Sequence, residues 1–183
     1  MNRWRYHQFL LMIAALLACC PSAARGQGNI YQGAEIKAGI VALMGKLVTW
    51  PSGVAPTGGT KLTIGILGPD PFQASTVNHL DRKLVGQNVN VQRFNTPEDY
   101  KPCHILVVSR TADFQAAVSK TQGNHVLLIA EGPGLAKQGA VINLVEDLTR
   151  NQVRMEINPD AVRREGLTIN PGVYRLPTVT IVR

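Results

Sequence analysis

The sequence has few of the residues from which catalytic and metal sites are built. It contains three cysteines and four histidines, and aromatic residues make up 5% of its 183 positions. No histidine stands with Cys, Asp or Glu at a spacing typical of zinc ligands. No serine lies in a G-x-S-x-G motif, and no G-x-G-x-x-G motif follows a predicted strand. The sequence therefore predicts no catalytic residues, no metal site and no cofactor, and the protein is not expected to be an enzyme.

Acidic residues are scarcer than basic ones. There are 12 acidic and 19 basic side chains, which gives a net charge of +7. The basic residues are spread thinly, because Arg82-Lys83 and Arg163-Arg164 are the only adjacent pairs and no aromatic residues are interleaved with them. This distribution argues against a nucleic-acid groove. An acidic partner or a membrane surface stays open as an interpretation.

No apolar run is long enough to span a bilayer, which takes roughly 20 residues. The longest, residues 9–18 (FLLMIAALLA), follows the basic residues Arg3 and Arg5 and precedes the small residues 22–24. This order is typical of a secretory signal peptide. We therefore expect residues 1–24 to be cleaved as a signal and 30–183 to form the folded, exported domain. Without Arg3 and Arg5, 17 basic and 12 acidic side chains leave a net charge of +5.

The cysteines allow an alternative at the N-terminus. Leu16-Leu17-Ala18-Cys19 also resembles a lipobox, in which Cys19 would carry a lipid anchor. With cleavage near Ala24, Cys19 and Cys20 leave with the signal, so Cys103 is the only cysteine of the mature domain and no internal disulfide can form. Its position before an apolar strand favours a small buried hydrophobe. Redox sensing or a bridge between subunits are the alternatives if it is exposed.

Residues 35–48 have apolar side chains at helical spacing. The predicted core face consists of Ile36, Ile40, Leu43, Met44, Leu47 and Val48. Lys37 and Lys46 lie off this face, so they are expected in solvent. Pro51 ends the helix, and Trp50 before it is interpreted as a core anchor or a local lid.

The following residues alternate between strand and helix patterns. Predicted strands cover residues 62–67, 88–94, 103–108 and 125–130, predicted helices cover 71–83 and 111–120, and residues 140–145 and 152–158 form a predicted hairpin. A short turn at 96–100 is predicted with Thr96 as its N-cap, and a short helix with Asn158 as its N-cap. The predicted fold class is α/β: a single three-layer Rossmann-like domain with a mostly parallel sheet and an antiparallel C-terminal hairpin.

Polar residues follow several of these strands. Asp70 is expected to cap the next helix, and Arg110 and Glu131 stand at the carboxyl ends of two other strands. Because ligands of parallel α/β sheets bind at that edge, a small-molecule crevice is one interpretation. Glu146-Asp147 is expected to be a solvated turn. Arg154 and Glu156 alternate with core residues, so they should share one face and form either an ion pair or a partner contact.

Motifs along nearly the whole mature chain resemble the YfiR-like family of exported bacterial proteins. They are Lys37-Ala38, Trp50-Pro51, residues 62–72 (LTIGILGPDPF), Cys103-His104-Ile105-Leu106, residues 139–145 (GAVINLV) and residues 153–158 (VRMEIN). The resemblance implies a periplasmic α/β domain that is often dimeric. It also implies a regulator that binds the periplasmic sensor region of an inner-membrane diguanylate cyclase or a related sensor protein. Such binding lowers cyclic-di-GMP synthesis and biofilm formation.

This chain departs from the family pattern at two places. The resemblance implies a disulfide bond in the best-known family member, whereas the mature chain here has one cysteine. An aromatic-rich run in the first helix is replaced by residues 41–45 (VALMG). The alternative function is a small-molecule-binding module that feeds a membrane sensor. The residues expected at the partner or ligand surface are Trp50, Asp70, Phe72, Arg110, Glu131, Arg154 and Glu156.

Overall fold

The computed structural model describes residues 25–56, 61–72 and 89–183, with side chains from residue 33 onward. Seven strands form one sheet, in the order β3 (Val89–Phe94), β2 (Leu62–Leu67), β4 (Ile105–Val108), β5 (Leu127–Glu131), β6 (Ile142–Asp147), β7 (Gln152–Ile157) and β9 (Val179–Ile181). The pairs from β3 to β6 are parallel, and β6 and β7 form the antiparallel hairpin. The predicted fold class is confirmed.

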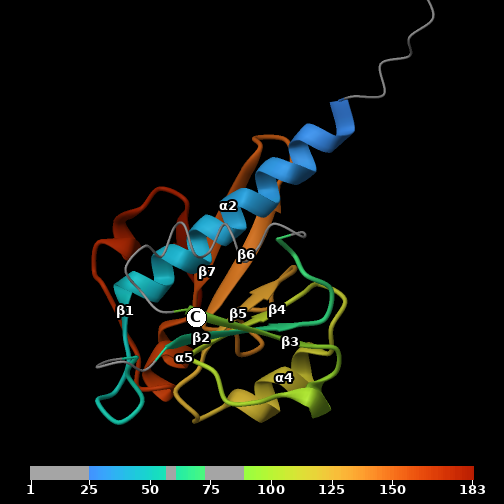
Figure 1. Ribbon diagram of the computed structural model, residues 1–183. Helices are drawn as coiled ribbons and strands as arrows, with labels where there is room; N and C mark the ends of the chain where they lie inside the picture. The colour runs from blue at the N-terminus through green and yellow to red at the C-terminus, as the bar shows by residue number, and fades with distance from the viewer. Residues whose placement is uncertain (1–24, 57–60, 73–88) are drawn as a thin grey trace, which may run out of the picture.

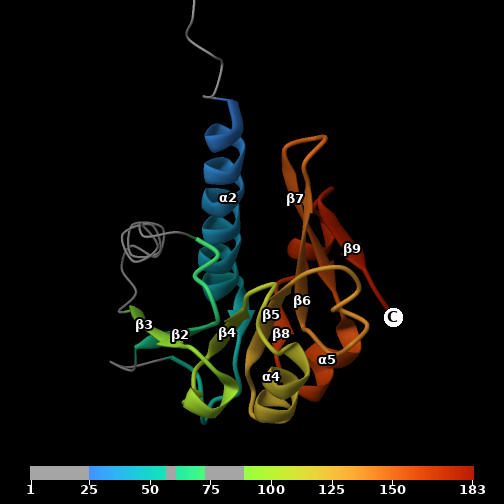
Figure 2. The same ribbon diagram turned by 90° about the vertical axis from the view of Figure 1, so that its right-hand side faces the viewer.

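Helices cover both faces of this sheet. The long helix α2 (Arg25–Leu47) lies on one side, and α4 (Phe114–Thr121) and α5 (Pro159–Arg164) lie on the other (Figure 1). The β6–β7 hairpin rises beside α2, and its tip points the same way as the N-terminal end of that helix (Figure 2). None of the helices in the described residues is long and apolar enough to cross a membrane.

Local sequence signals account for the short elements. The side chain of Asn158 accepts hydrogen bonds from the backbone N–H groups of Asp160 and Ala161, at 2.9 and 3.1 Å, and starts α5 as predicted. Thr96 caps the 3₁₀ turn η1 (Pro97–Asp99), and the Asp99 carboxylate accepts the Thr96 N–H at 3.0 Å. The helix predicted over 71–83 lies largely outside the described residues.

The C-terminal tail adds two strands to the fold. β8 (Thr168–Ile169) pairs with β1 (Val48–Thr49), directly after α2. After the 3₁₀ turn η2 (Val173–Arg175), β9 extends the main sheet by pairing in parallel with β7. The tail therefore pairs both with the strand that follows α2 and with the outer strand of the hairpin.

The orientation of α2 differs from the prediction. Met44 and Val48 are buried as expected, but Ile36 and Leu43 are 37% and 40% exposed while Lys37 is only 7% exposed. The face against the sheet is instead made mainly of small residues: Ala34, Ala38, Val41, Ala42 and Gly45. Small side chains let the helix backbone approach the sheet, and Lys37 has buried acidic partners there. Ile36 and Leu43 consequently turn outward.

Candidate functional site

Four charged side chains meet where α2 crosses the carboxyl ends of the central strands. Lys37 Nζ lies 3.2 Å from Glu131 Oε1, at the end of β5, and 3.1 Å from Glu146 Oε1 on β6. Arg110, after β4, reaches the other oxygen of Glu146 at 3.4 Å. The side chains of Lys37 and Glu131 are 9% and 8% exposed. We call these four residues the Lys37 cluster, and it ties α2 to three neighbouring strands.

Burial and charge act in opposite directions on Glu131. Burial raises the pKa of its carboxyl group, Lys37 and Arg110 lower it, and Glu146 raises it again, with burial prevailing. The prediction for Glu146 as part of a solvated turn is wrong, because it is partly buried and paired with Lys37. The sequence could not show this pairing, since the two residues are far apart in the chain.

The sheet edge beside this cluster also has polar groups. The Ser109 Oγ atom is buried and has no hydrogen-bond partner in the described part of the chain. A Cβ atom on Gly68, at the end of β2, would lie 2.4 Å from it. Asp70 accepts the Phe72 N–H at 2.9 Å and pairs with Arg93 at 2.9 Å. Asp70 thus holds the turn after β2, as a capping residue would.

Arg154 and Glu156 share the face of β7 opposite to its core residues, as predicted. No ion pair joins them in the described structure. Glu156 instead accepts a hydrogen bond at 2.8 Å from Asn143, its cross-strand neighbour, which also donates to the Gly132 carbonyl at 2.7 Å. Arg154 is exposed. The partner contact stays a prediction for Arg154.

Two of the expected surface residues lie in the core. Trp50 and Phe72 are 5% and 3% exposed, because each packs into the main hydrophobic cluster. The Trp50 ring meets His104 edge to face at a centroid distance of 5.9 Å. Trp50 is therefore a core anchor, and neither side chain offers a contact surface. Arg110 and Arg154 remain exposed members of the expected set.

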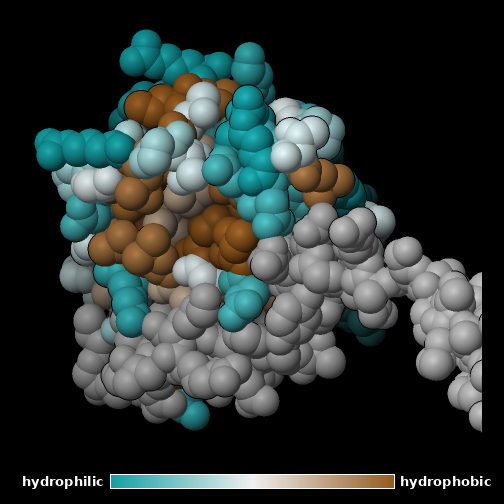
Figure 3. Space-filling view, turned by 90° about the horizontal axis from the view of Figure 1, so that it is seen from above, coloured by the Kyte–Doolittle hydropathy of each residue, from teal (hydrophilic) through white to brown (hydrophobic). Residues whose placement is uncertain are grey.

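The outward side of α2 is an apolar feature that the sequence interpretation missed. Ile36 and Leu43 are exposed on it, and Ile40 and Leu47, which continue the same helical spacing, are partly buried. We call these four residues the α2 outer face. Seen from above, hydrophobic side chains gather on this side of the molecule among hydrophilic ones (Figure 3). The alanines and Gly45, spaced three or four apart, were the available signal that the small face packs inward.

A shallow pocket of about 90 Å³ continues this face toward the hairpin. It lies between the N-terminal half of α2 and the hairpin tip. Its lining residues are Gly33, Ile36, Glu146, Asp147, Leu148, Asn151, Gln152 and Val153. Its size suits a single side chain, so it extends a protein-binding face and does not resemble a site for a larger ligand.

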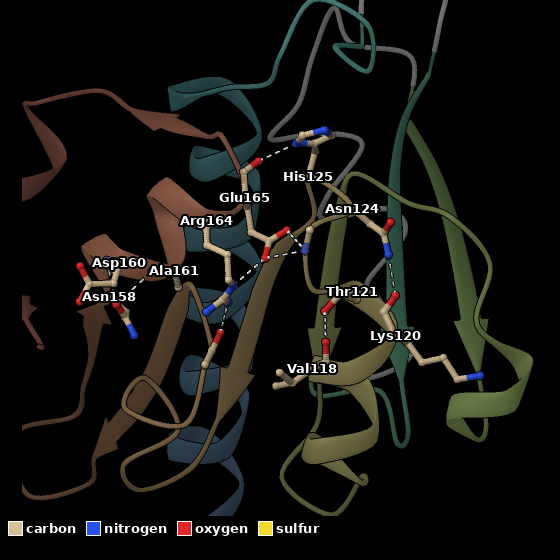
Figure 4. Close-up of polar contacts among 12 residues, drawn as sticks. Val118, Lys120, Thr121, Asn124, His125, Asn158, Asp160, Ala161, Arg164 and Glu165 are labelled. Carbon is tan, nitrogen blue, oxygen red and sulfur yellow. Dashed lines mark hydrogen bonds and ion pairs between the residues drawn. The ribbon is translucent and has the colours of Figure 1, made fainter.

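A second buried charge has a structural role. Glu165 is 2% exposed, and both of its carboxylate oxygens accept the Gly123 N–H, at 3.1 and 3.0 Å (Figure 4). Arg164 Nε donates to it at 3.1 Å, and the Glu165 carbonyl lies 2.8 Å from His125 Nδ1. These contacts join α5 to the turn before β5. His125 is therefore part of a structural contact. The described residues hold no cluster of three potential metal-ligating side chains.

Cys103 is expected to resist modification. It is partly buried against the core, and burial raises the pKa of its thiol to about 12. Because the thiolate is the reactive species, alkylation by iodoacetamide at pH 8 should be at least about a hundredfold slower in the folded protein than in urea. Mass spectrometry over time measures both rates. Equal rates would restore the redox-sensing interpretation.

Comparisons with known proteins bear on the family and the fold. A family model described as YfiR/HmsC-like matches residues 34–178. No curated protein matches the sequence at a significant level. A conserved domain protein from Vibrio cholerae O1 biovar El Tor is 11% identical with a TM-score of 0.53, over 82% of this chain and 60% of that one. At this identity the likeness concerns the fold alone.

A further solved structure is that of an ABC domain from Streptococcus pneumonia in complex with L-Trp. It is 13% identical with a TM-score of 0.49, over 66% of this chain and 55% of that one. The chain thus spans less than two thirds of either solved protein.

Proposed function

The chain belongs to the YfiR/HmsC-like family, and on that premise we propose that it is a periplasmic regulator of cyclic-di-GMP signalling. It binds the periplasmic sensor region of an inner-membrane diguanylate cyclase and represses it, which keeps biofilm formation low. Residues 1–24 are its export signal, either cleaved near Ala24 or ending before a lipidated Cys19. The family match and the composition support this function.

The observation that carries the proposal is the α2 outer face. A helix of a monomeric domain normally turns its large apolar residues inward, yet here Ile36 and Leu43 are exposed and Lys37 is buried. The Lys37 cluster holds the helix in this orientation. An exposed apolar stripe with a pocket at one end is typical of a protein-binding surface. We propose that the cyclase binds along it, with a second copy of this chain as the other family-implied partner.

Replacing Leu43 by glutamate tests this surface. The charge would be buried without a partner in the complex, so repression should be lost and cellular cyclic-di-GMP should rise several-fold, as in a strain lacking the protein. Lys46→Glu is the matched control, because Lys46 is exposed on the same helix outside the α2 outer face. It should leave cyclic-di-GMP unchanged.

The same variants separate the two partners. Light scattering shows whether Leu43→Glu dissociates a homodimer, and co-purification from membranes shows whether it releases a cyclase. A folded, exported Leu43→Glu protein that still represses would contradict the proposal. Circular dichroism and the level of exported protein verify that the variant is folded.

A second candidate function is a small-molecule-binding module that feeds a membrane sensor. The parallel strands run in the order 2-1-3-4-5 of doubly wound sheets, which places the switch point between β2 and β4. The buried, unpartnered Ser109 Oγ lies there. A thermal-shift screen across amino acids, nucleotides and metal ions tests this candidate, because a ligand of the folded state raises Tm. A ligand that raises the Tm of the unchanged protein but not that of Ser109→Ala would favour the small-molecule-binding module over a regulator that binds no ligand.

A further inference from the structure

The tip of the β6–β7 hairpin presents an unusually exposed leucine. Leu148 is 77% exposed, more than any other large hydrophobic residue in the described part of the chain. It stands at the end of β6, where the hairpin extends beyond the body of the domain (Figure 2). Exposing such a side chain to water is unfavourable, so a contact that covers Leu148 would be favourable.

The turn holds Leu148 outward. The Asp147 carboxylate accepts hydrogen bonds from Thr149 Oγ1 at 2.6 Å, from the Arg150 backbone N–H at 3.2 Å and from the Arg150 guanidinium at 3.0 Å. These bonds lower the pKa of Asp147 to about 2, so it stays ionised at neutral pH. Asn151 completes the turn with a φ of 50°. These hydrogen bonds order the turn that carries the exposed Leu148.

The most exposed charges around this tip are positive. The Arg150 side chain is 71% exposed, whereas that of its partner Asp147 is 11% exposed. Arg154 is exposed on the next strand, and Arg110, a member of the Lys37 cluster, is 61% exposed. Without Arg3 and Arg5 the net charge is also positive, at +5. This combination of an apolar tip and outward arginines complements an anionic surface with an apolar interior.

The direction of the chain points to the same surface. α2 begins at Arg25, shortly after the apolar run of residues 9–18 and Cys19. The N-terminal end of α2 and the hairpin tip lie on the same side of the molecule (Figures 1 and 2). The N-terminus could be attached to a membrane before the signal is cleaved or through a lipid on Cys19. That membrane would then face the hairpin tip as well.

We propose that the hairpin tip docks on an anionic bilayer surface, with Leu148 between the lipid headgroups and with Arg150 and Arg154 against their phosphates. Interfacial elements of peripheral proteins bind in this way, through a small apolar area together with basic side chains. The contact goes beyond the proposed function and needs no cyclase. It also places the α2 outer face beside the membrane, where a membrane-bound partner is found.

Vesicle sedimentation tests the proposal with the protein as exported and processed by a bacterial host. It should bind vesicles made of equal parts of phosphatidylethanolamine and phosphatidylglycerol, and bind less as salt is added. Binding to phosphatidylcholine vesicles should be weak. Leu148→Ser should weaken partitioning about tenfold, and Arg150→Gln about fivefold.

Two matched controls are available elsewhere in the chain. Arg163 is 73% exposed and pairs with Asp160 three residues earlier, as Arg150 does with Asp147. Ile181 is 52% exposed on β9. Arg163→Gln and Ile181→Ser should bind vesicles like the unchanged protein.

Three results would overturn the proposal. They are no binding to anionic vesicles at low salt, equal losses in the controls and the tip variants, and binding that the tip variants do not change. The last result would trace membrane capture to the N-terminus. A Leu148→Ser protein that binds vesicles normally but fails to repress cyclic-di-GMP would assign the tip to the protein partner.

Discussion

Lys37→Met is expected to lower the free energy of unfolding by about 3–5 kcal/mol at pH 7, since it leaves a buried carboxylate without its counter-charge. Glu131 is 6% exposed, and its Oε1 atom lies 3.2 Å from Lys37 Nζ. Methionine keeps the length and the apolar stem of the side chain, so the loss reports the charge. Urea unfolding measures it. Lys46→Met, on the exposed side of the same helix, should change stability by less than about 0.5 kcal/mol.

The pH dependence gives the cause of that loss. The pKa of Glu131 is already raised in the folded state, and removing Lys37 raises it further. A raised folded-state pKa favours folding below the unfolded-state value and disfavours it as the pH rises through the folded-state value. Lys37→Met should therefore regain stability between pH 7 and pH 4.5. An equal deficit at both pH values would contradict this explanation.

A double variant separates the ion pair from the packing. Lys37→Met with Glu131→Gln removes both charges and should recover most of the stability, because a neutral amide is less costly to bury than an unpaired carboxylate. Glu146 keeps Arg110 as its partner in this variant. No recovery would mean that the lysine acts through its packing against the sheet.

Gly68→Ala is expected to cost about 3–4 kcal/mol of stability. The φ of Gly68 is +84°, where an L residue costs about 1–2 kcal/mol. Its Cβ would also lie 2.4 Å from Ser109 Oγ and 3.0 Å from Ala112 Cβ, and such overpacking typically adds 1–3 kcal/mol. Urea or thermal unfolding measures the sum.

Gly123→Ala isolates the backbone contribution. Gly123 has a φ of +76°, and nothing lies within 4 Å of a Cβ placed on it. It should therefore lose only the conformational part, about 1–2 kcal/mol. Adding Ser109→Ala to Gly68→Ala should recover part of the stability difference between the Gly68→Ala and Gly123→Ala variants. Equal losses for the two glycine variants would show that the sheet edge at Ser109 is open enough to accept a side chain.

The strands could be predicted closely because their signals are local. β2 matches its predicted range of residues 62–67, and the hairpin strands begin within two residues of their predicted starts. Alternating or continuous apolar runs between turn residues decide strand positions without reference to the rest of the chain. The strand β9 was missed, because three residues pairing with a strand more than 20 positions away leave no local pattern.

The candidate site was predictable only in part. Arg110 and Glu131 were identified because they follow strands that end at one edge of a parallel sheet. Trp50, which was also interpreted as a core anchor, and Phe72 were expected at the partner or ligand surface but are buried, since polarity and size do not tell on which side of a turn an aromatic ring packs. The turn around Leu148 became visible only when its hydrogen bonds and exposure were known.

By itself, the sequence determined the α/β class, the alternation of elements, the caps at Thr96 and Asn158, and the family resemblance. These features depend on neighbours within a few residues or on motifs in order along the chain. Only the tertiary structure decided which side of α2 faces the sheet. Periodicity favoured Ile36 and Leu43 as its core face, but Glu131 and Glu146, about 100 residues away, draw Lys37 inward and leave the larger apolar side chains outside.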